Sequence, residues 1–174
     1  QDDKFKLTYS FVPDGTINTD IFNAESELRA QVNEKFPGGF SAFKEVVRDV
    51  FDQISEVTPL EFEEVSDDGA TLPQNEGARN QRGDIRFSMV PSFPDLSEFA
   101  LAFAYQPEFG DVVIISDHLE DLTNSTANFL FLRNLLAHEL GHSLGLGHVQ
   151  PRNSTKLMET HITLAFDGFQ EDDQ

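Results

Sequence analysis

Cysteine and tryptophan are both absent from the 174 residues of this chain. Without cysteine, no disulfide can cross-link the fold, and no thiolate can bind a metal ion or act as a nucleophile. A chain without cysteine suits an oxidising and a reducing compartment equally, so this absence does not indicate where the protein resides. Chemistry that depends on a thiol is excluded.

Basic residues are scarce. The chain has 12 lysines and arginines against 31 aspartates and glutamates, which gives a formal net charge of −19. A surface of this sign repels nucleic acid and anionic membranes, so we expect neither as a principal partner. Solubility is the simplest interpretation of the excess acid. Adaptation to salt, or bound calcium that offsets some of the carboxylates, is the alternative.

Long hydrophobic runs are also missing, and no segment approaches the length needed to span a bilayer. The opening stretch, QDDKFKLTYSF, lacks the basic region and apolar core of a signal peptide. Hydrophobic residues nevertheless make up 39% of the chain, and 17 phenylalanines supply material for a packed interior. We therefore expect a single, monomeric domain over residues 1–174 with one core.

Several short segments have the apolar patterning of β-strands. They are residues 5–11, 60–65, 84–89, 100–105 and 111–116. The last, DVVIIS, is continuously apolar, which is typical of a strand covered on both faces. Residues 66–83 are rich in Asp, Gly, Asn and Gln and predict a surface loop.

Helical periodicity is strongest over residues 41–55, where apolar side chains recur at steps of three and four residues. The predicted buried stripe is Phe43, Val46, Val47, Val50, Phe51 and Ile54. A weaker helical pattern covers residues 24–35. A long helix is predicted over residues 126–144, with capping side chains at 123–126, and the chain beyond it is irregular to its end.

The stretch HELGHSLGLGH lies at the end of that last helix. On a helix, His138 and His142 project from the same face one turn apart and can share one zinc ion at about 2.0–2.1 Å each. Glu139 is rotated away from them and is too short and too offset to serve as a natural third ligand. It can instead reach a water molecule that the metal activates, and act as a general base.

The glycines of this stretch explain how a third ligand could be supplied. Gly145 permits the positive backbone angle that ends a helix abruptly, after which His148 can turn back toward the metal. Three neutral imidazoles leave a fourth position open, which is the catalytic rather than the structural arrangement of zinc. Histidines four residues apart also occur on solvated helix faces, but three of the five histidines fall within this window.

The stretch resembles the metzincin signature, and KLMET supplies Met158 where metzincins carry the methionine of their Met-turn. Within metzincins the chain resembles the matrixins, through the segments KFKLTYSF, GDIRFSM, LAFAYQP and NFLFLRNLLAHELGHSLGLGH. The resemblance implies an α+β fold with a twisted, mixed five-stranded sheet, a backing helix and an active-site helix. It also implies an upper subdomain over 1–147 and a small lower subdomain over 148–174 that contains the Met-turn and stops before the family's last helix.

Some positions depart from the matrixin pattern. Phe103 and Val113 stand where animal matrixins place histidines that ligate a second, structural zinc, so we predict one zinc ion only. The acidic run that binds calcium in the family is reduced to Asp111 and Asp117, which leaves one calcium site as a possibility. Residues 159–162 replace the usual wall of the pocket for the side chain after the scissile bond.

The resemblance implies a secreted zinc endopeptidase that acts on protein or peptide substrates. His138, His142 and His148 would hold the zinc, with Glu139 as general base and Leu135 in the wall of the substrate pocket. An extended substrate would pair, as an added strand, with Ala100, Leu101, Ala102, Phe103 and Ala104. The alternatives are a non-catalytic protein-binding module on the same fold and a metal-stabilised structural domain, although the latter normally closes all four zinc positions.

Overall fold

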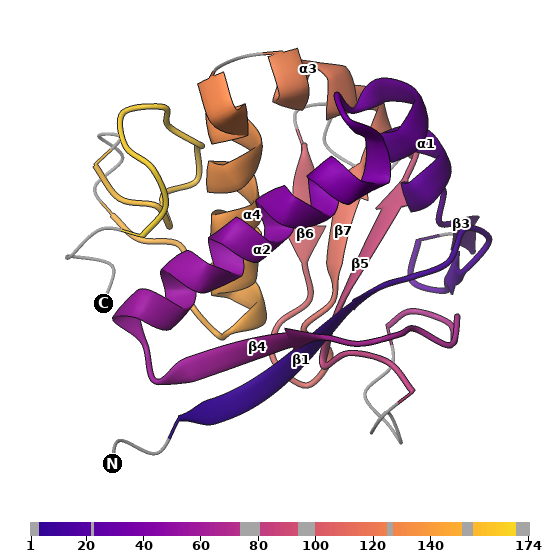
Figure 1. Ribbon diagram of the computed structural model, residues 1–174, viewed down its shortest axis with the longest axis horizontal. Coiled ribbons are helices and arrows are strands. Elements are labelled where there is room, and N and C mark those ends of the chain that lie inside the picture. The colour runs from indigo at the N-terminus through magenta and orange to yellow at the C-terminus, as the bar shows by residue number, and fades with distance from the viewer. Residues whose placement is uncertain are drawn as a thin grey trace.

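A computed structural model describes residues 4–21, 23–73, 81–93, 100–124, 127–150 and 155–169. One face of a twisted five-stranded sheet is crossed by helix α2 (Gly39–Val57), which packs against strand β4 (Leu60–Glu64) and helix α4 (Leu130–Ser143). Helix α4 in turn packs against strand β6 (Ala102–Ala104), at the opposite edge of the sheet (Figure 1). None of the described helices is long and apolar enough to cross a membrane.

The sheet has the strand order β4-β1-β5-β7-β6. Strand β1 (Phe5–Phe11) pairs in parallel with β4 and with β5 (Ile85–Val90), and β5 pairs in parallel with β7 (Val112–Ile115). Only β6 is antiparallel among the described strands of this sheet. The predicted α+β fold with a mixed five-stranded sheet is therefore confirmed.

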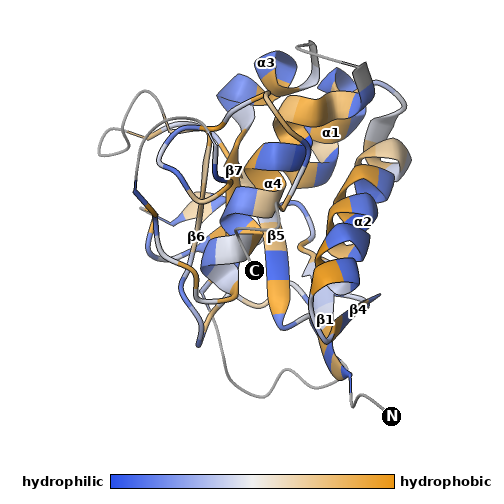
Figure 2. Cartoon of the chain, turned by 90° about the vertical axis from the view of Figure 1, so that its left-hand side faces the viewer, coloured by the Kyte–Doolittle hydropathy of each residue, from blue (hydrophilic) through white to orange (hydrophobic). Residues whose placement is uncertain are grey.

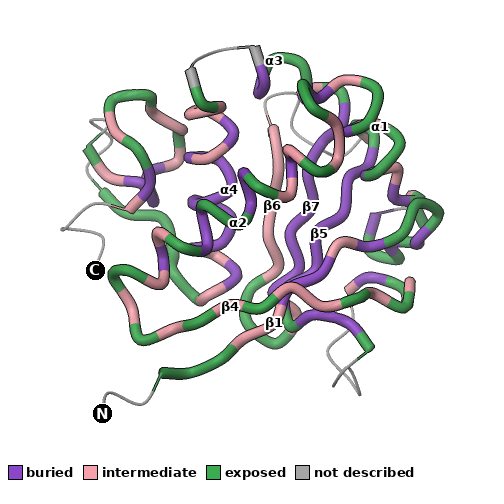
Figure 3. The backbone as a smooth tube through the Cα atoms, in the orientation of Figure 1, coloured by how far each residue is buried: buried purple, intermediate pink, exposed green. Residues whose placement is uncertain are grey.

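The core lies between the sheet and the helices. All residues of β5 and β7 are buried, which confirms the prediction that the segment VVII is covered on both faces (Figure 3). The six predicted apolar residues of α2 are all buried as well, and hydrophobic and hydrophilic residues occupy different sides of that helix (Figure 2). Burial of each such side chain contributes about 1.5–3 kcal/mol, and Phe51 of α2 stacks on Tyr9 of β1 with ring centroids 4.3 Å apart.

The predicted helix over residues 24–35 is shorter in the structure. Ala24–Glu25 forms strand β3, which pairs with β2 (Ile17–Asn18), and helix α1 covers only Leu28–Lys35. The amide of Ser26 donates to the carbonyl of Thr16 (2.8 Å), and this hairpin pairing delays the start of the helix.

The start of the last helix was also predicted too early. Helix α4 begins at Leu130, because Asn128 and Phe129 have φ angles of 57° and 55°, which interrupt a right-handed helix. Upstream, Leu119–Asn124 forms a separate helix, α3, that the sequence did not predict, and residues 125–126 lie outside the described part of the chain.

The loop after β4 is not purely a surface loop. Leu72 is fully buried, and the carboxylate of Asp67 binds the buried guanidinium of Arg86 on β5 (2.8 Å). Arg86 also donates to the carbonyl of Ala70 (2.8 Å), so this one side chain ties the loop to the sheet. The remainder of the predicted loop, residues 74–80, lies outside the described residues.

Candidate metal centre

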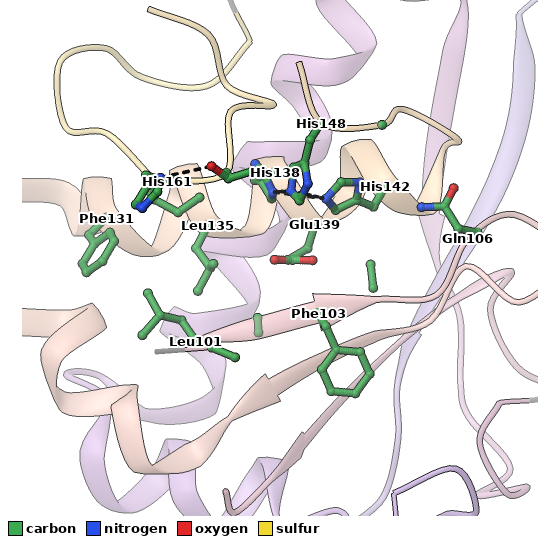
Figure 4. A pocket seen from close by; sticks show the side chains of 16 residues that line it. Leu101, Phe103, Gln106, Phe131, Leu135, His138, Glu139, His142, His148 and His161 are labelled. Carbon is green, nitrogen blue, oxygen red and sulfur yellow. Dashed lines mark hydrogen bonds between the residues drawn. The ribbon is translucent and has the colours of Figure 1, made fainter. Parts of the chain in front are cut away.

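Three imidazoles converge at the end of helix α4. The Nε2 atoms of His138 and His142 are 3.1 Å apart, and each lies 3.2 Å from Nε2 of His148. His138 is 5% exposed, His142 is half-buried and His148 is exposed (Figure 4). Among the described residues, no other group of three or more histidine, aspartate or glutamate side chains comes together at metal-binding distance.

These distances fit a shared zinc ion. Two nitrogens bound tetrahedrally at about 2.0–2.1 Å would lie about 3.3 Å from each other, close to the separations seen here. The Nδ1 atoms of His138 and His142 each lie 2.8 Å from a backbone carbonyl, of Leu157 and Leu146 respectively. A proton on Nδ1 that is donated to a carbonyl leaves the Nε2 lone pair free, which is the tautomer that metal-binding histidines adopt.

The chain reverses direction at Gly145 to bring in His148. Gly145 has a φ of 99°, the positive backbone angle that the sequence predicts there. Its amide donates to the carbonyl of His142 (2.9 Å), and the amide of Leu146 donates to that of Gly141 (2.8 Å). These two bonds close the helix in the manner of a glycine cap and direct the following residues back toward the two helical histidines.

Met158 is buried beneath the histidines. Its sulfur lies so close to Gly141 that a Cβ at position 141 would overlap it, and the carbonyl of Met158 accepts a hydrogen bond from the amide of Val149 (2.9 Å). Val149, the residue after His148, is therefore hydrogen-bonded to the methionine that packs under the helix.

Glu139 faces the cavity in front of the histidines and is 6% exposed (Figure 4). Burial raises the pKa of its carboxyl group from 4.5 to about 7. Among the described residues its carboxylate has no hydrogen-bond or ion-pair partner. A bound cation beside it would favour the ionised form and lower this pKa.

Burial has the opposite effect on His138, because it disfavours the charged imidazolium. Burial lowers the pKa of His138 from 6.5 to about 4; the neighbouring imidazoles of His142 and His148 add to this effect, and the bond to the Leu157 carbonyl opposes it. His138 is therefore neutral at pH 7, as a metal ligand must be.

A cavity of about 660 Å³ lies between β6 and the segment after Met158. Leu135 and all five residues predicted from 100 to 104 line it. Thr160, His161 and Ile162, which belong to the segment expected to replace the usual wall of the substrate pocket, line it as well. The sequence missed Gln106 and Phe131, which also line it. Phe131 could have been found, since it lies four residues before Leu135 and hence on the same face of the helix.

Strand β6 is the edge of the sheet on the cavity side. The carbonyl of Leu101 accepts a hydrogen bond from the amide of Ile115 on β7, and Phe103 pairs with Val113. The amide of Tyr105 donates to the carbonyl of Asp111, directly before β7. Because hydrogen-bonding groups alternate along a strand, the main-chain groups of Ala102 and Ala104 point away from β7, toward the cavity. The ring of Phe103 points away from the histidines and packs with a second apolar cluster (Figure 4).

The two carboxylates predicted for calcium do not come together. Asp111 and Asp117 flank opposite ends of β7, and each accepts a hydrogen bond from a backbone amide, of Arg86 (3.2 Å) and Ser92 (2.6 Å) respectively. Calcium binding remains a prediction without a described cluster of ligands to support it.

Comparisons with known proteins place this geometry in context. The family model described as "Matrixin" matches residues 27–173, a span that contains Glu139 and all three converging histidines. Human matrix metalloproteinase-19 is 35% identical to the chain over 102 residues. That similarity covers 59% of this chain and 18% of the human protein, so the chain spans only a small part of that relative's length.

Proposed function

The chain belongs to the matrixin family, and on this premise we propose that it is a zinc-dependent endopeptidase that hydrolyses peptide bonds in extended protein substrates. One observation supports this most strongly. Three Nε2 atoms lie within 3.2 Å of one another, next to a buried glutamate that has no partner among the described residues. That arrangement leaves room for substrate on the cavity side, whereas a structural zinc site is closed by four protein ligands.

His138, His142 and His148 would hold the zinc ion. When bound, the ion would polarise the carbonyl of the scissile peptide bond and lower the pKa of a water molecule. The hydrogen bonds from Nδ1 of His138 and His142 to backbone carbonyls keep both rings oriented with Nε2 toward the site.

Glu139 would act first as general base and then as general acid. It would take a proton from the attacking water and pass it to the nitrogen of the departing amine. Burial keeps the Glu139 carboxylate away from bulk water, and the charge of a bound zinc ion would favour its ionised form, which a general base must have before it takes the proton.

Strand β6 and the cavity would position the substrate. An extended peptide could add to the open edge of β6 through the outward main-chain groups of Ala102 and Ala104. The side chain after the cleaved bond would enter the cavity against its apolar lining residues Phe131, Leu135 and Ile162. We further propose that the protein is secreted, as the resemblance to matrixins suggests.

The test is a zinc titration combined with a cleavage assay on a mixed peptide library. We expect one zinc per chain, cleavage that stops when a chelator removes the metal, and recovery when zinc is restored. A chain that binds one zinc and captures peptides without cutting any would favour the protein-binding module. A chain that binds no zinc would contradict the zinc endopeptidase and would leave the protein-binding module as the alternative.

A further inference from the structure

The two walls of the cavity are built differently. On one side lies β6, a strand held in register by the sheet. On the other side lie Thr160, His161 and Ile162, within residues 160–169, which form neither helix nor strand. We call residues 160–162 the coil wall. Because no regular element fixes the coil wall, its position must depend on side chains that reach it from elsewhere.

Asn134 of α4 reaches the coil segment with its whole amide group. Its Nδ2 donates to the carbonyl of Thr163 (2.7 Å) and to that of Phe166 (2.8 Å), and its Oδ1 accepts from the amide of Gly168 (2.8 Å). Both Nδ2 hydrogens are thereby used. The side chain is 0% exposed; its hydrogen bond with Gly168 is buried and its two bonds to carbonyls are partly buried, which limits competition with water.

The chemistry of these bonds requires an amide. Aspartate offers no donor for the two carbonyls, leucine offers neither donor nor acceptor, and glutamine is one methylene longer. A buried asparagine within the apolar run FLFLRNLLA is therefore explained by the three backbone groups that it pairs, because an unpaired polar group there would be costly. Next to it, Arg133 forms an ion pair with Asp167 of the same segment.

The location of Asn134 links the coil wall to the metal site. Thr163, whose carbonyl Asn134 holds, directly follows Ile162 of the coil wall. Leu135 follows Asn134 on the helix and lines the cavity, and His138 lies one turn further on. Asn134 thus ties the segment after the coil wall to the helix that carries two of the three converging histidines, next to the ion pair between Arg133 and Asp167.

We propose that Asn134 is a positioning residue that sets the width of the pocket for the substrate side chain after the cleaved bond. This inference rests on the proposed endopeptidase function. A wall held at fixed distance favours side chains that fill the present space between Phe131, Leu135 and Ile162 and excludes longer ones. Release of the wall widens the pocket and weakens the contacts of well-fitting side chains.

The test compares two peptide substrates that differ only after the cleaved bond, one with leucine there and one with the longer homophenylalanine. In Asn134→Leu, we expect the ratio of kcat/KM for the leucine peptide over the homophenylalanine peptide to fall about tenfold, because loss of the buried hydrogen bonds releases the wall and widens the pocket. The change should arise mainly in KM, with one zinc still bound. Asn33→Leu is the matched control: Asn33 bonds the amide of Phe40 (3.0 Å) and is not among the residues that line the cavity.

Hydrogen exchange supplies a readout that does not depend on activity. The amide of Gly168 should be protected in the wild-type protein and should exchange about tenfold faster in Asn134→Leu and Asn134→Ala, which both lack the acceptor for it. Asn134→Ala removes the same three hydrogen bonds with a smaller side chain and is the second variant if leucine prevents folding. An unprotected Gly168 amide in the wild-type protein would overturn the proposal without any variant.

The possible results distinguish failure of the proposed endopeptidase function from failure of the positioning role of Asn134. If the zinc-loaded wild type cleaves neither these two peptides nor any member of the mixed peptide library, the endopeptidase function fails, and the selectivity role of Asn134 fails with it even where Gly168 is protected. If the wild type cleaves them and a folded Asn134→Leu keeps the wild-type ratio, the endopeptidase stands and the positioning role is wrong. Faster exchange with an unchanged ratio also rules out the positioning role, because Asn134 would then serve stability alone.

Discussion

The sulfur of Met158 packs directly against Gly141, at the centre of the helical turn between His138 and His142. No Cβ fits at position 141 without overlapping that sulfur. Glycine is therefore required here for close approach of the methionine and not for an unusual backbone angle. This contact explains why a glycine can stand inside a helix, where it costs about 1 kcal/mol relative to alanine.

Gly141→Ala should consequently destabilise the protein. Overpacking of a buried contact costs about 1–3 kcal/mol, which outweighs the gain in helix propensity, and thermal unfolding should show a lower Tm. The double variant Gly141→Ala/Met158→Ala should be less destabilised than the sum of its two single variants, because the overlap is gone. Strict additivity in this double-mutant cycle would mean that the two residues do not clash.

Glu139→Gln should stabilise the metal-free protein in a pH-dependent manner. The pKa of Glu139 is raised by burial from 4.5 to about 7, so its contribution to stability is present below pH 4.5 and lost as the pH rises through 7. Glutamine cannot ionise and therefore avoids this loss of unfolding free energy, which is on the order of 3 kcal/mol above pH 7. The gain in Tm over wild type should be small at pH 4.5 and should level off above pH 7.

His138 shapes the remaining pH dependence of this variant. Its pKa is lowered from 6.5 to about 4, so the unfolded chain binds a proton between these values that the folded chain does not. In chelator-treated Glu139→Gln, stability should rise with pH from about 4 to 6.5. A difference in Tm between variant and wild type that does not vary with pH would show that Glu139 is not buried as a lone carboxyl group.

The ion pair between Asp67 and Arg86 should dominate the acid stability of the fold. Burial alone would raise the pKa of Asp67, but hydrogen bonds from Arg86, Ser10 and the Gly69 amide, and the charge of Arg86, outweigh it, and the pKa is lowered. A lowered pKa stabilises the fold above the unfolded value near 3.8, and this stability is lost as the pH falls below it. This loss of stability is measured by following unfolding with circular dichroism at pH values from about 5 down to about 2.

Removal of the aspartate should destabilise the protein more in the buried pair Asp67–Arg86 than in the neighbouring pair Asp68–Arg82. Asp67→Ala leaves the fully buried Arg86 guanidinium uncompensated and should cost about 3–5 kcal/mol. Asp68→Ala is the control, because Asp68 is 31% exposed and pairs with Arg82 at the rim of the same loop. Equal losses in urea unfolding would argue against a special role for the buried pair.

Ala102→Pro tests whether substrates add to the edge of β6. Proline removes an amide hydrogen that points toward the cavity, while the hydrogen bonds of Leu101 with Ile115 and of Tyr105 with Asp111 remain. Loss of one main-chain bond to substrate should raise KM about tenfold without loss of zinc. Ala102→Gly keeps the amide hydrogen and should retain a KM near that of wild type; a proline variant with unchanged KM would exclude pairing at this residue.

Much of the fold could be predicted because its signals are local. The apolar stripe of α2 and the continuous run of β7 follow from periodicity alone, and both are buried as expected. The start of α4 was missed because positive φ angles at Asn128 and Phe129 have no distinctive sequence pattern. The first turn of the predicted helix at 24–35 was wrong because pairing between β2 and β3 overrides a weak helical propensity.

The converging histidines were predictable for the same reason, since HELGHSLGLGH contains two of them on one helical turn and a glycine before the third. The place of the coil wall beside the cavity followed only from the resemblance to matrixins. How residues 160–162 are held there was not predicted, because their position depends on contacts with distant residues. Asn134, which holds the segment after them, looks in the sequence like an isolated polar residue in an apolar helix. Its role depends on three backbone groups about 30 residues away along the chain, which no short-range pattern reveals.

X-ray absorption at the zinc edge tests the central claim most directly, namely that three imidazoles hold one metal ion and leave a position open beside Glu139. For the zinc-loaded chain we predict three histidine nitrogens and one exchangeable solvent ligand at about 2.0–2.1 Å, with the same spectrum in Glu139→Gln. Four protein ligands, or a spectrum that changes because the Glu139 carboxylate itself binds the ion, would contradict the account.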